Sequence, residues 1–134
     1  MKKYSELIAL FSVFLIFTNC GDNNYSEGKR LYEKLCQNCH QDNGLGLGGL
    51  YPPLAHSDYL KNNQDILPRI IKFGLKDTIT VNGKVYDFQA MEGFGSLTPF
   101  QINNIICYIN TNWGNQIPLP NIQNTIKSIE TYKK

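Results

Sequence analysis

Two cysteines and a histidine stand within five residues of one another in the segment CQNCH, Cys36 to His40. This spacing is typical of half a zinc site, a dithiol redox pair or the covalent attachment of a haem. A structural zinc site needs four ligands, and after the motif the only further histidine or cysteine candidates are His56 and Cys107, each isolated in the sequence. A dithiol redox pair needs a βαβ setting, whereas the patterns around CQNCH are helical. A plain disulfide between Cys36 and Cys39 would give the histidine no role.

A covalent haem would use every residue of the motif. Two thiols on one edge of a turn can form thioethers with the two vinyl groups, and the same backbone then carries the adjacent imidazole to the iron. The motif alone also produces false positives, so the decisive question is whether the chain supplies a sixth iron ligand and an apolar box.

Met91 is the candidate for that second ligand. It is the only methionine after the initiator, and it lies in the glycine-rich segment QAMEGFGSL. Buried methionine is usually core filler, but a single one in an irregular loop downstream of CQNCH favours an axial thioether. His56 is the rival, although a lone histidine in a polar turn is more typical of a surface position.

The motif comes at the end of a predicted helix. Residues 24–36 have an amphipathic pattern, with Asn24 as the expected N-cap and Glu27 completing a capping box. The segment that follows, residues 42–54, is rich in glycine and ends in two prolines. It excludes regular structure and indicates a loop moulded around something, or a simple linker.

The middle of the chain predicts a helix and a hairpin. The helix is expected over residues 65–73, with Asp65 as its cap and Gly74 as its stop. Residues 79–86 predict a β-hairpin, because their central Asn-Gly pair suits a tight turn between β-branched flanks.

The clearest helix signals come later. Thr98 is the expected cap, Pro99 occupies the first turn and Gln101 completes a capping box. One apolar face follows at helical spacing: Ile102, Ile105, Ile106 and Ile109. Residues 121–132 predict a short terminal helix, with a frayed tail as the alternative.

The first residues have the features of an export signal, with a basic start and an apolar run over residues 7–17. That run is shorter than the roughly 20 residues a membrane-spanning helix needs. The segment FTNC is similar to the lipobox of bacterial lipoproteins, which predicts acylation of Cys20, with ordinary signal cleavage as the alternative. We therefore expect a signal peptide at 1–19, a short tether at 20–24 and one domain at 25–134.

The expected mature chain has almost no net charge. The whole chain has 13 Lys and Arg and 11 Asp and Glu residues, and removing Lys2, Lys3 and Glu6 leaves 11 and 10, a net charge near +1. This balance gives no basic face for nucleic acid and no strong electrostatic steering of a partner.

Nearly the whole mature chain resembles a bacterial class I cytochrome c. The resemblance lies in the order of GKRLYEKLCQNCH, GLGLGGLYPPLAHSDYL, FGLKDTITVNGKVYDFQAM and LTPFQINNIICYINTNWGN. It is strongest to the single-haem domains found with respiratory oxidases and reductases. It implies an all-α fold of three to five helices around one covalent haem c, with a minor β-hairpin. It also implies Cys36 and Cys39 as the thioether attachments, His40 as the proximal iron ligand and Met91 as the distal one.

The resemblance implies secondary roles as well. Pro52 or Pro53 is placed to accept a hydrogen bond from the proximal imidazole, and Pro53 is included in the predicted site. The first and last family helices are expected to cross at Gly28 and Tyr108. Residues that could line the haem or meet a propionate are Tyr59 and Arg69.

Two departures from the family pattern bear on the site. Cys107 replaces a residue that is often threonine, and we expect it to be a free thiol. Glu92 and Gly93 follow Met91 where the family usually has prolines, which predicts a softer loop and a weaker iron–sulfur bond.

The expected function is one-electron transfer rather than catalysis on a small-molecule substrate. Partners would be exported or membrane-bound respiratory redox proteins, with the protein on the periplasmic side of a bacterial membrane, lipid-anchored or else soluble. The alternatives are a haem subunit of a larger oxidase or reductase complex, a haem sensor that binds a gas if Met91 swings away, and a zinc- or disulfide-stabilised module without haem.

Overall fold

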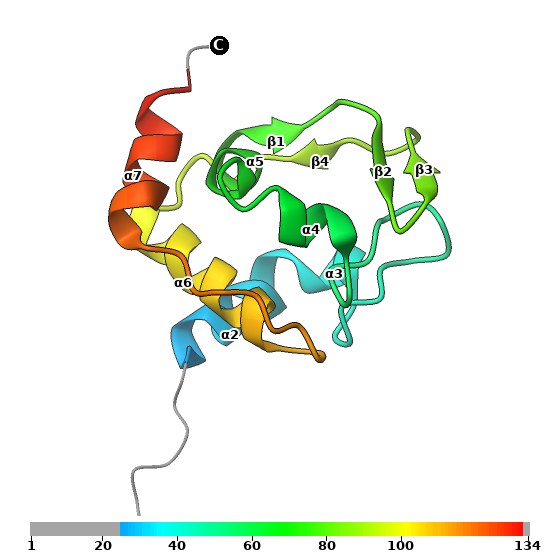
Figure 1. Ribbon diagram of the computed structural model, residues 1–134, viewed down its shortest axis with the longest axis horizontal. Helices are drawn as coiled ribbons and strands as arrows, with labels where there is room; N and C mark the ends of the chain where they lie inside the picture. Colours follow the sequence, from blue (N-terminus) through cyan, green and yellow to red (C-terminus); the bar gives the residue numbers. More distant parts are fainter. Residues whose placement is uncertain (1–24, 133–134) are drawn as a thin grey trace, which may run out of the picture.

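Two helices from distant parts of the sequence pack across one another in the structure, a computed structural model that describes residues 25–132 (Figure 1, lower left). They are α2 (Ser26–Leu35) and α6 (Pro99–Thr111). A Cβ atom on Gly28 would overlap the carbonyl oxygen of Asn104 and lie 3.0 Å from the Cβ of Tyr108. The missing side chain therefore allows the close approach expected at Gly28 and Tyr108.

Helix α6 forms where the sequence predicted it, for the reasons predicted. The side chain of Thr98 accepts a hydrogen bond from the backbone N–H of Gln101, whose own side chain accepts one from the N–H of Thr98. Both bonds of the capping box are thus present, and each satisfies a donor that the first helical turn leaves free. The isoleucine face is buried against the other helices.

Helix α2 starts one residue later than a cap at Asn24 would place it. Its N-cap is Tyr25, which makes no side-chain capping bond, while Asn24 lies outside the described residues. Glu27 does not complete a capping box and instead pairs with Arg30, with nitrogen–oxygen distances of 2.8 and 2.9 Å.

Four further helices complete the fold: α3 (Gln37–His40), α4 (Asp58–Asn62), α5 (Leu67–Phe73) and α7 (Ile122–Glu130). With α2 and α6 they make six helical segments in residues 25–132, of which α3 and α4 have only four and five residues. The expected all-α class is confirmed. Helix α4 was not predicted; it begins where the Ser57 hydroxyl accepts a hydrogen bond from the N–H of Leu60.

For helix α5, the predicted N-cap is wrong and the predicted end is confirmed. Asp65 is not its N-cap, because the helix begins at Leu67 after Ile66, and the backbone oxygen of Asp65 accepts a hydrogen bond from Ser128. Gly74 ends the helix as expected.

Four short strands lie on one side of the helices (Figure 1). The predicted hairpin is present, with β2 (Ile79–Val81) antiparallel to β3 (Lys84–Tyr86). A second pair, β1 (Gly74–Leu75) with β4 (Met91–Glu92), was not predicted from the sequence. It joins the end of α5 to the segment that contains Met91.

Helix α7 confirms the helical alternative for the terminal segment and packs on the outer side of α5 and α6 (Figure 1). The buried hydroxyl of Thr125 donates to the side-chain oxygen of Asn103 at 2.9 Å. Beyond the helix, the ring of Tyr132 stacks on Phe73 with centroids 5.0 Å apart. Among residues 25–132, no helix is long and apolar enough to cross a membrane.

Candidate functional site

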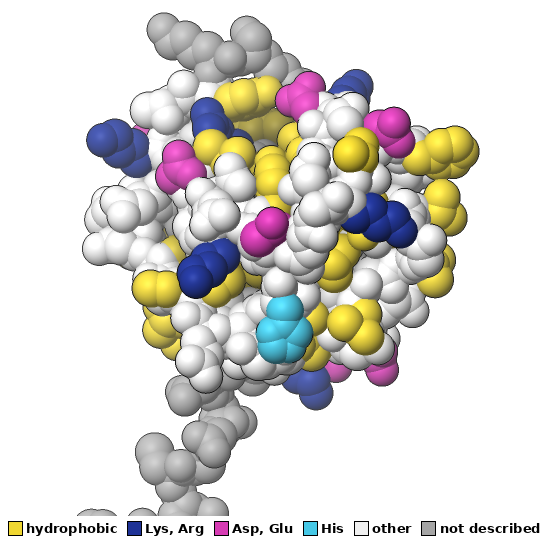
Figure 2. Space-filling model, turned by 45° about the vertical axis from the view of Figure 1, so that its right-hand side comes forward, with side chains coloured by type: hydrophobic (Ala, Val, Ile, Leu, Met, Phe, Trp, Pro, Cys, Tyr) yellow, Lys and Arg dark blue, Asp and Glu magenta, His cyan; other side chains and the backbone are white. Residues whose placement is uncertain are grey.

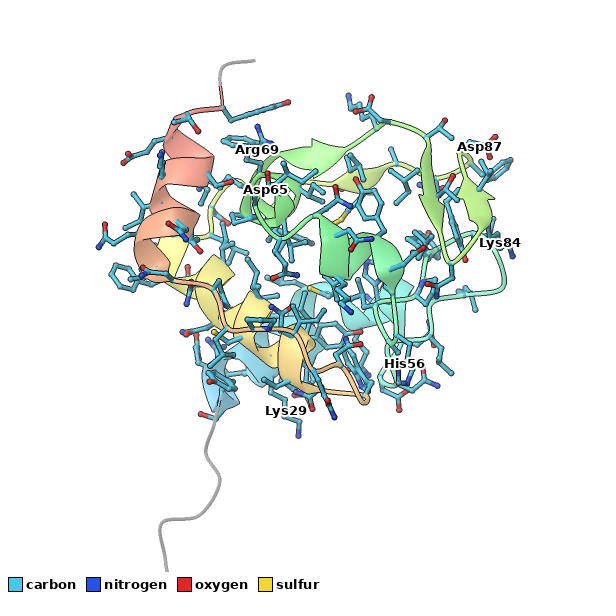
Figure 3. The ribbon with its side chains drawn as sticks, in the orientation of Figure 1. Lys29, His56, Asp65, Arg69, Lys84 and Asp87 are labelled. Atoms are coloured by element: carbon cyan, nitrogen blue, oxygen red, sulfur yellow. The ribbon has the colours of Figure 1, made fainter. Side chains whose placement is uncertain are left out.

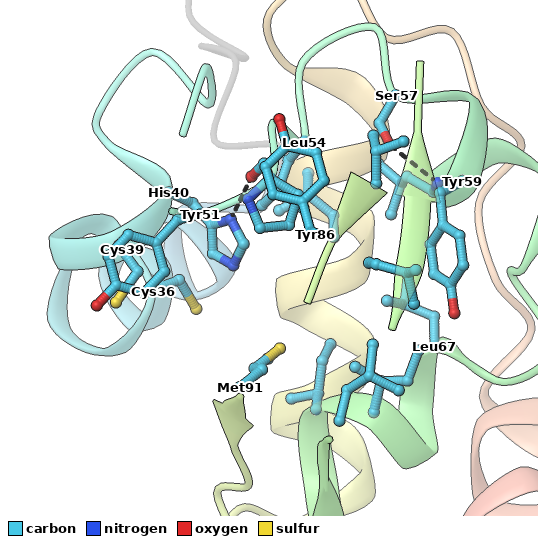
Figure 4. Close-up of a pocket in the computed structure, with 18 of the residues that line it drawn as sticks. Cys36, Cys39, His40, Tyr51, Leu54, Ser57, Tyr59, Leu67, Tyr86 and Met91 are labelled. Atoms are coloured by element: carbon cyan, nitrogen blue, oxygen red, sulfur yellow. Dashed lines mark hydrogen bonds between the residues drawn. The ribbon is translucent and has the colours of Figure 1, made fainter. Parts of the chain in front are cut away.

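The CQNCH motif forms the turn that follows α2. The N–H of Cys36 still donates to the carbonyl of Tyr32 at 2.8 Å, and the N–H of His40 donates to the carbonyl of Cys36 at 2.9 Å. The helical bonding therefore continues through the motif. As a result, both thiols and the imidazole lie on one short segment at the edge of a cavity (Figure 4).

An aromatic cluster at the crossing of α2 and α6 fixes this turn. The rings of Tyr32, Tyr108 and Trp113 lie 5.0 to 5.6 Å apart, centroid to centroid. Two polar atoms of the cluster hold the chain just after the motif: the Tyr32 hydroxyl donates to the carbonyl of Gln41 at 2.6 Å, and the Trp113 indole donates to that of Asp42 at 2.9 Å. Neither Tyr32 nor Trp113 was predicted from the sequence to position the site.

The imidazole of His40 is oriented by a backbone carbonyl. Its Nδ1 lies 3.0 Å from the carbonyl oxygen of Pro52. Because that oxygen can only accept, Nδ1 carries the proton and Nε2 keeps its lone pair. Figure 4 shows the Nε2 side of the ring turned towards the cavity. The partner is Pro52 rather than Pro53, the proline included in the predicted site; Pro53 contributes to the cavity wall.

The protonation of His40 suits a metal ligand. Burial lowers its pKa, and the hydrogen bond to the Pro52 carbonyl offsets part of that effect. The neutral imidazole is therefore favoured, which is the form that binds a metal. Burial also raises the pKa of Cys36 to about 12, with a further contribution from the nearby Cys39, so this thiol is neutral at pH 7.

The glycine-rich loop wraps closely around the motif. The N–H of Gly46 donates to the carbonyl of His40 at 3.0 Å, and its backbone has a positive φ of 70°. A Cβ atom at this position would lie 2.8 Å from the carbonyl carbon of Pro52. Only glycine satisfies both the left-handed conformation and the close contact. The loop is therefore part of the wall of the site, as predicted, and not a linker.

The cavity has a volume of about 400 Å³ and is lined mainly by apolar side chains. They come from the α2 end, α5, α6, the β2–β3 hairpin and the proline-containing loop. Representative residues from these five walls are Leu35, Ile71, Ile105, Val81 and Leu54. Such a lining is the apolar box that a covalent haem requires.

Met91 reaches the same cavity from another wall. It lies in β4, where it is paired with Leu75 of β1, and its side chain packs partly buried against the core. In Figure 4 its sulfur atom points into the space that His40 and Cys36 also face. The structure thus brings together four of the residues predicted for the site: Cys36, Cys39, His40 and Met91.

Other candidates separate into those near the cavity and those away from it. Tyr59 lines the cavity. Arg69 does not; its guanidinium lies over the ring of Tyr132, 5.6 Å from the centroid, beside α7 (Figure 3). His56 is exposed and lies outside the cavity wall (Figure 3). Cys107 is a buried free thiol on α6, as expected.

A zinc site receives no support from the geometry. Within residues 25–132, no three His, Cys, Asp or Glu side chains come together as metal ligands. Cys36 and Cys39 are also not joined by a disulfide. The arrangement is instead one imidazole nitrogen and one thioether facing a shared apolar space with two thiols on its rim.

Comparison with known proteins agrees with this geometry. The sequence profile of the cytochrome c family matches residues 25–113. The chain belongs to the cytochrome c family. Cytochrome c-552 of Thermus thermophilus is 32% identical over 93 residues, which cover 66% of this chain and 70% of the relative. A second cytochrome c-552, from a designated strain of the same species, is also 32% identical over 93 residues. That match covers 66% of this chain and 62% of the relative.

Family membership identifies the cofactor and the general activity. As a cytochrome c, the protein carries one covalently bound haem c with its iron and is a haem-based electron carrier. The residues in the cavity fit that group, because the donor atoms are of the right types and the walls are apolar.

Proposed function

We propose that the haem is attached through Cys36 and Cys39, and that His40 and Met91 bind its iron from opposite sides. The observation that carries this proposal is the shared cavity into which the imidazole Nε2 and the methionine sulfur both point (Figure 4). The haem supplies one-electron chemistry, with a potential raised by thioether ligation. The chain's own residues position the imidazole through Pro52 and keep water from the cavity with apolar walls.

Two axial protein ligands would leave no open position for a substrate. The segment that contains Met91 is also held by the β1–β4 pair, which supports a fixed ligand rather than one that leaves easily. We therefore infer an electron carrier in preference to a gas sensor or an enzyme.

A Met91→Ala variant tests the axial ligand directly. The ferric wild-type protein, made in a host that attaches haem c, should show the weak near-infrared band of an iron–methionine bond. The variant should lose this band, have a lower reduction potential and bind carbon monoxide when reduced. Phe94→Leu is a suitable control, because Phe94 lines the same cavity but offers no ligand atom. If the wild type and Met91→Ala have identical spectra and potentials, Met91 is not a ligand.

We further propose that the protein is exported and exchanges electrons with respiratory proteins on the periplasmic side of a bacterial membrane, either as a separate carrier or as a subunit of a larger complex. On the face in Figure 2, acidic and basic side chains alternate with apolar ones, without a patch of one sign. Such a surface fits a short-lived encounter with a partner better than long-range steering by charge.

Membrane attachment would come from acylation of Cys20. This residue and the predicted signal and tether, residues 1–24, lie outside the described residues. Mass spectrometry of the protein extracted from membranes tests the proposal. A mature chain that begins at an acylated Cys20 supports it, whereas a free thiol at Cys20 contradicts it.

A further inference from the structure

Lys72 binds the backbone of the segment that follows Met91 in the sequence. Lys72 lies in the last turn of α5. Its ammonium group donates hydrogen bonds to two backbone carbonyls, those of Gly95 and Leu97, each at 2.6 Å. Both carbonyls belong to the loop that connects β4 to α6, so one side chain closes that loop at two points. Hydrogen bonds from a charged donor are stronger than those between neutral groups.

Two backbone contacts of this segment come from the same short stretch of α5 and β1, and the side chain of Leu97 is buried in the main core. The N–H of Phe94 donates to the carbonyl of Ile71 at 2.9 Å. Gly93 packs so closely on the backbone that a Cβ atom would lie 2.6 Å from the nitrogen of Gly74. Within residues 25–132, Lys72 is the one side chain outside the 91–97 segment that donates a hydrogen bond to it.

These contacts restrain a segment whose own sequence does not make it rigid. Glu92 and Gly93 follow Met91 where the cytochrome c pattern usually has prolines, and the sequence therefore predicted a soft loop. Strand pairing restrains the first part of the segment, and Lys72 restrains the remainder together with the hydrogen bond between Phe94 and Ile71 and the buried side chain of Leu97. Without Lys72, two carbonyls would lose their charged partner and the segment would open more often.

We propose that Lys72 is a positioning residue for the axial methionine: it keeps the 91–97 segment closed and so determines how often Met91 leaves the iron. This inference rests on the proposed role of Met91. An external ligand can bind the iron only in the fraction of molecules in which Met91 has left, so its apparent affinity measures that fraction.

The test is an imidazole titration of the ferric holoprotein. Lys72→Leu removes the donor, and we expect imidazole to bind about tenfold more tightly than to the wild type. Lys72→Arg keeps a charged donor and should restore most of the wild-type affinity. Lys76→Leu is the matched control, since Lys76 is exposed, lies four residues away and makes no side-chain hydrogen bond to a described residue. It removes the same charge and should stay within about twofold of the wild type.

A second background separates positioning from general damage to the fold. In Met91→Ala the methionine no longer competes, so adding Lys72→Leu should leave the imidazole affinity unchanged. Equal affinity of Lys72→Leu, Lys76→Leu and the wild type would overturn the inference, as would a Lys72→Leu effect that persists in the Met91→Ala background. If the wild type lacks the near-infrared band and Met91→Ala does not tighten imidazole binding, the proposed ligand itself is wrong, and the inference falls with it.

Discussion

Substitution of Gly28 by alanine sets two physical effects of opposite sign against each other. Alanine is a better helix former than glycine by about 1 kcal/mol, so propensity alone predicts a more stable α2. At the crossing with α6, however, the new methyl group would lie 2.8 Å from the carbonyl carbon of Asn104, in addition to overlapping its oxygen. Carbon–carbon contacts in proteins are normally about 3.5–4.0 Å.

The clash should win because its partner is helical backbone, which cannot move aside by changing a rotamer. Overpacking of this kind typically costs 1–3 kcal/mol, and the rigid partner places Gly28→Ala near the upper end, about 3 kcal/mol. After the gain in propensity, we expect a net loss of about 2 kcal/mol in the free energy of unfolding. For a domain of this size that corresponds to a fall in Tm of roughly 10 °C.

Thermal and denaturant unfolding of the holoprotein, followed by far-ultraviolet circular dichroism, measures this change. Gly95→Ala is the matched control, because a Cβ atom there would meet no atom within 4 Å. It should leave Tm unchanged or raise it slightly. A Gly28→Ala protein as stable as the wild type would refute the close-packing argument and show that α2 and α6 can move apart at little cost.

Three further changes test other parts of the structure. Thr98→Ala removes the capping-box bond to the first turn of α6 and should lower the free energy of unfolding by about 1 kcal/mol in urea titrations. Thr125→Val keeps the shape of a buried side chain but deletes its hydrogen bond to Asn103, and a loss of about 1 kcal/mol is expected in the same assay. Burial raises the pKa of Tyr32 above its ordinary value of 10.0, so the unfolded chain releases this proton first and stability should fall as pH rises above 10. Tyr32→Phe should flatten that decline by at most ~1.4 kcal/mol per pH unit; identical slopes for the two proteins between pH 9 and about 11.5 would contradict it.

Local signals predicted the elements that form through local interactions. The capping box at Thr98 and the isoleucine spacing gave α6, and the Asn-Gly pair gave the hairpin from Ile79 to Tyr86. The four residues predicted to hold the haem meet in one cavity. They could be predicted because CQNCH is a single short motif and Met91 is the chain's only internal methionine.

Features that depend on distant parts of the chain were missed. The β1–β4 pair joins Leu75 to Met91 through two-residue strands, which are too short to leave a periodic pattern. The choice between Pro52 and Pro53 depends on which carbonyl the fold turns towards the imidazole, and nothing in two adjacent prolines reveals it. Arg69 was a candidate for meeting a propionate, but its guanidinium covers the ring of Tyr132, which lies beyond the end of α7.

The crossing of α2 with α6 has a consequence for the order of events during synthesis. Helix α2 has ten residues, fewer than the roughly 12–15 that an isolated helix needs to be even marginally stable in water. Its packing partner begins at Pro99, far later in the chain, so the helix that precedes CQNCH cannot settle until most of the polypeptide has emerged. We therefore expect the turn that contains Cys36 and Cys39 to stay unfixed on a growing chain until α6 can pack on α2.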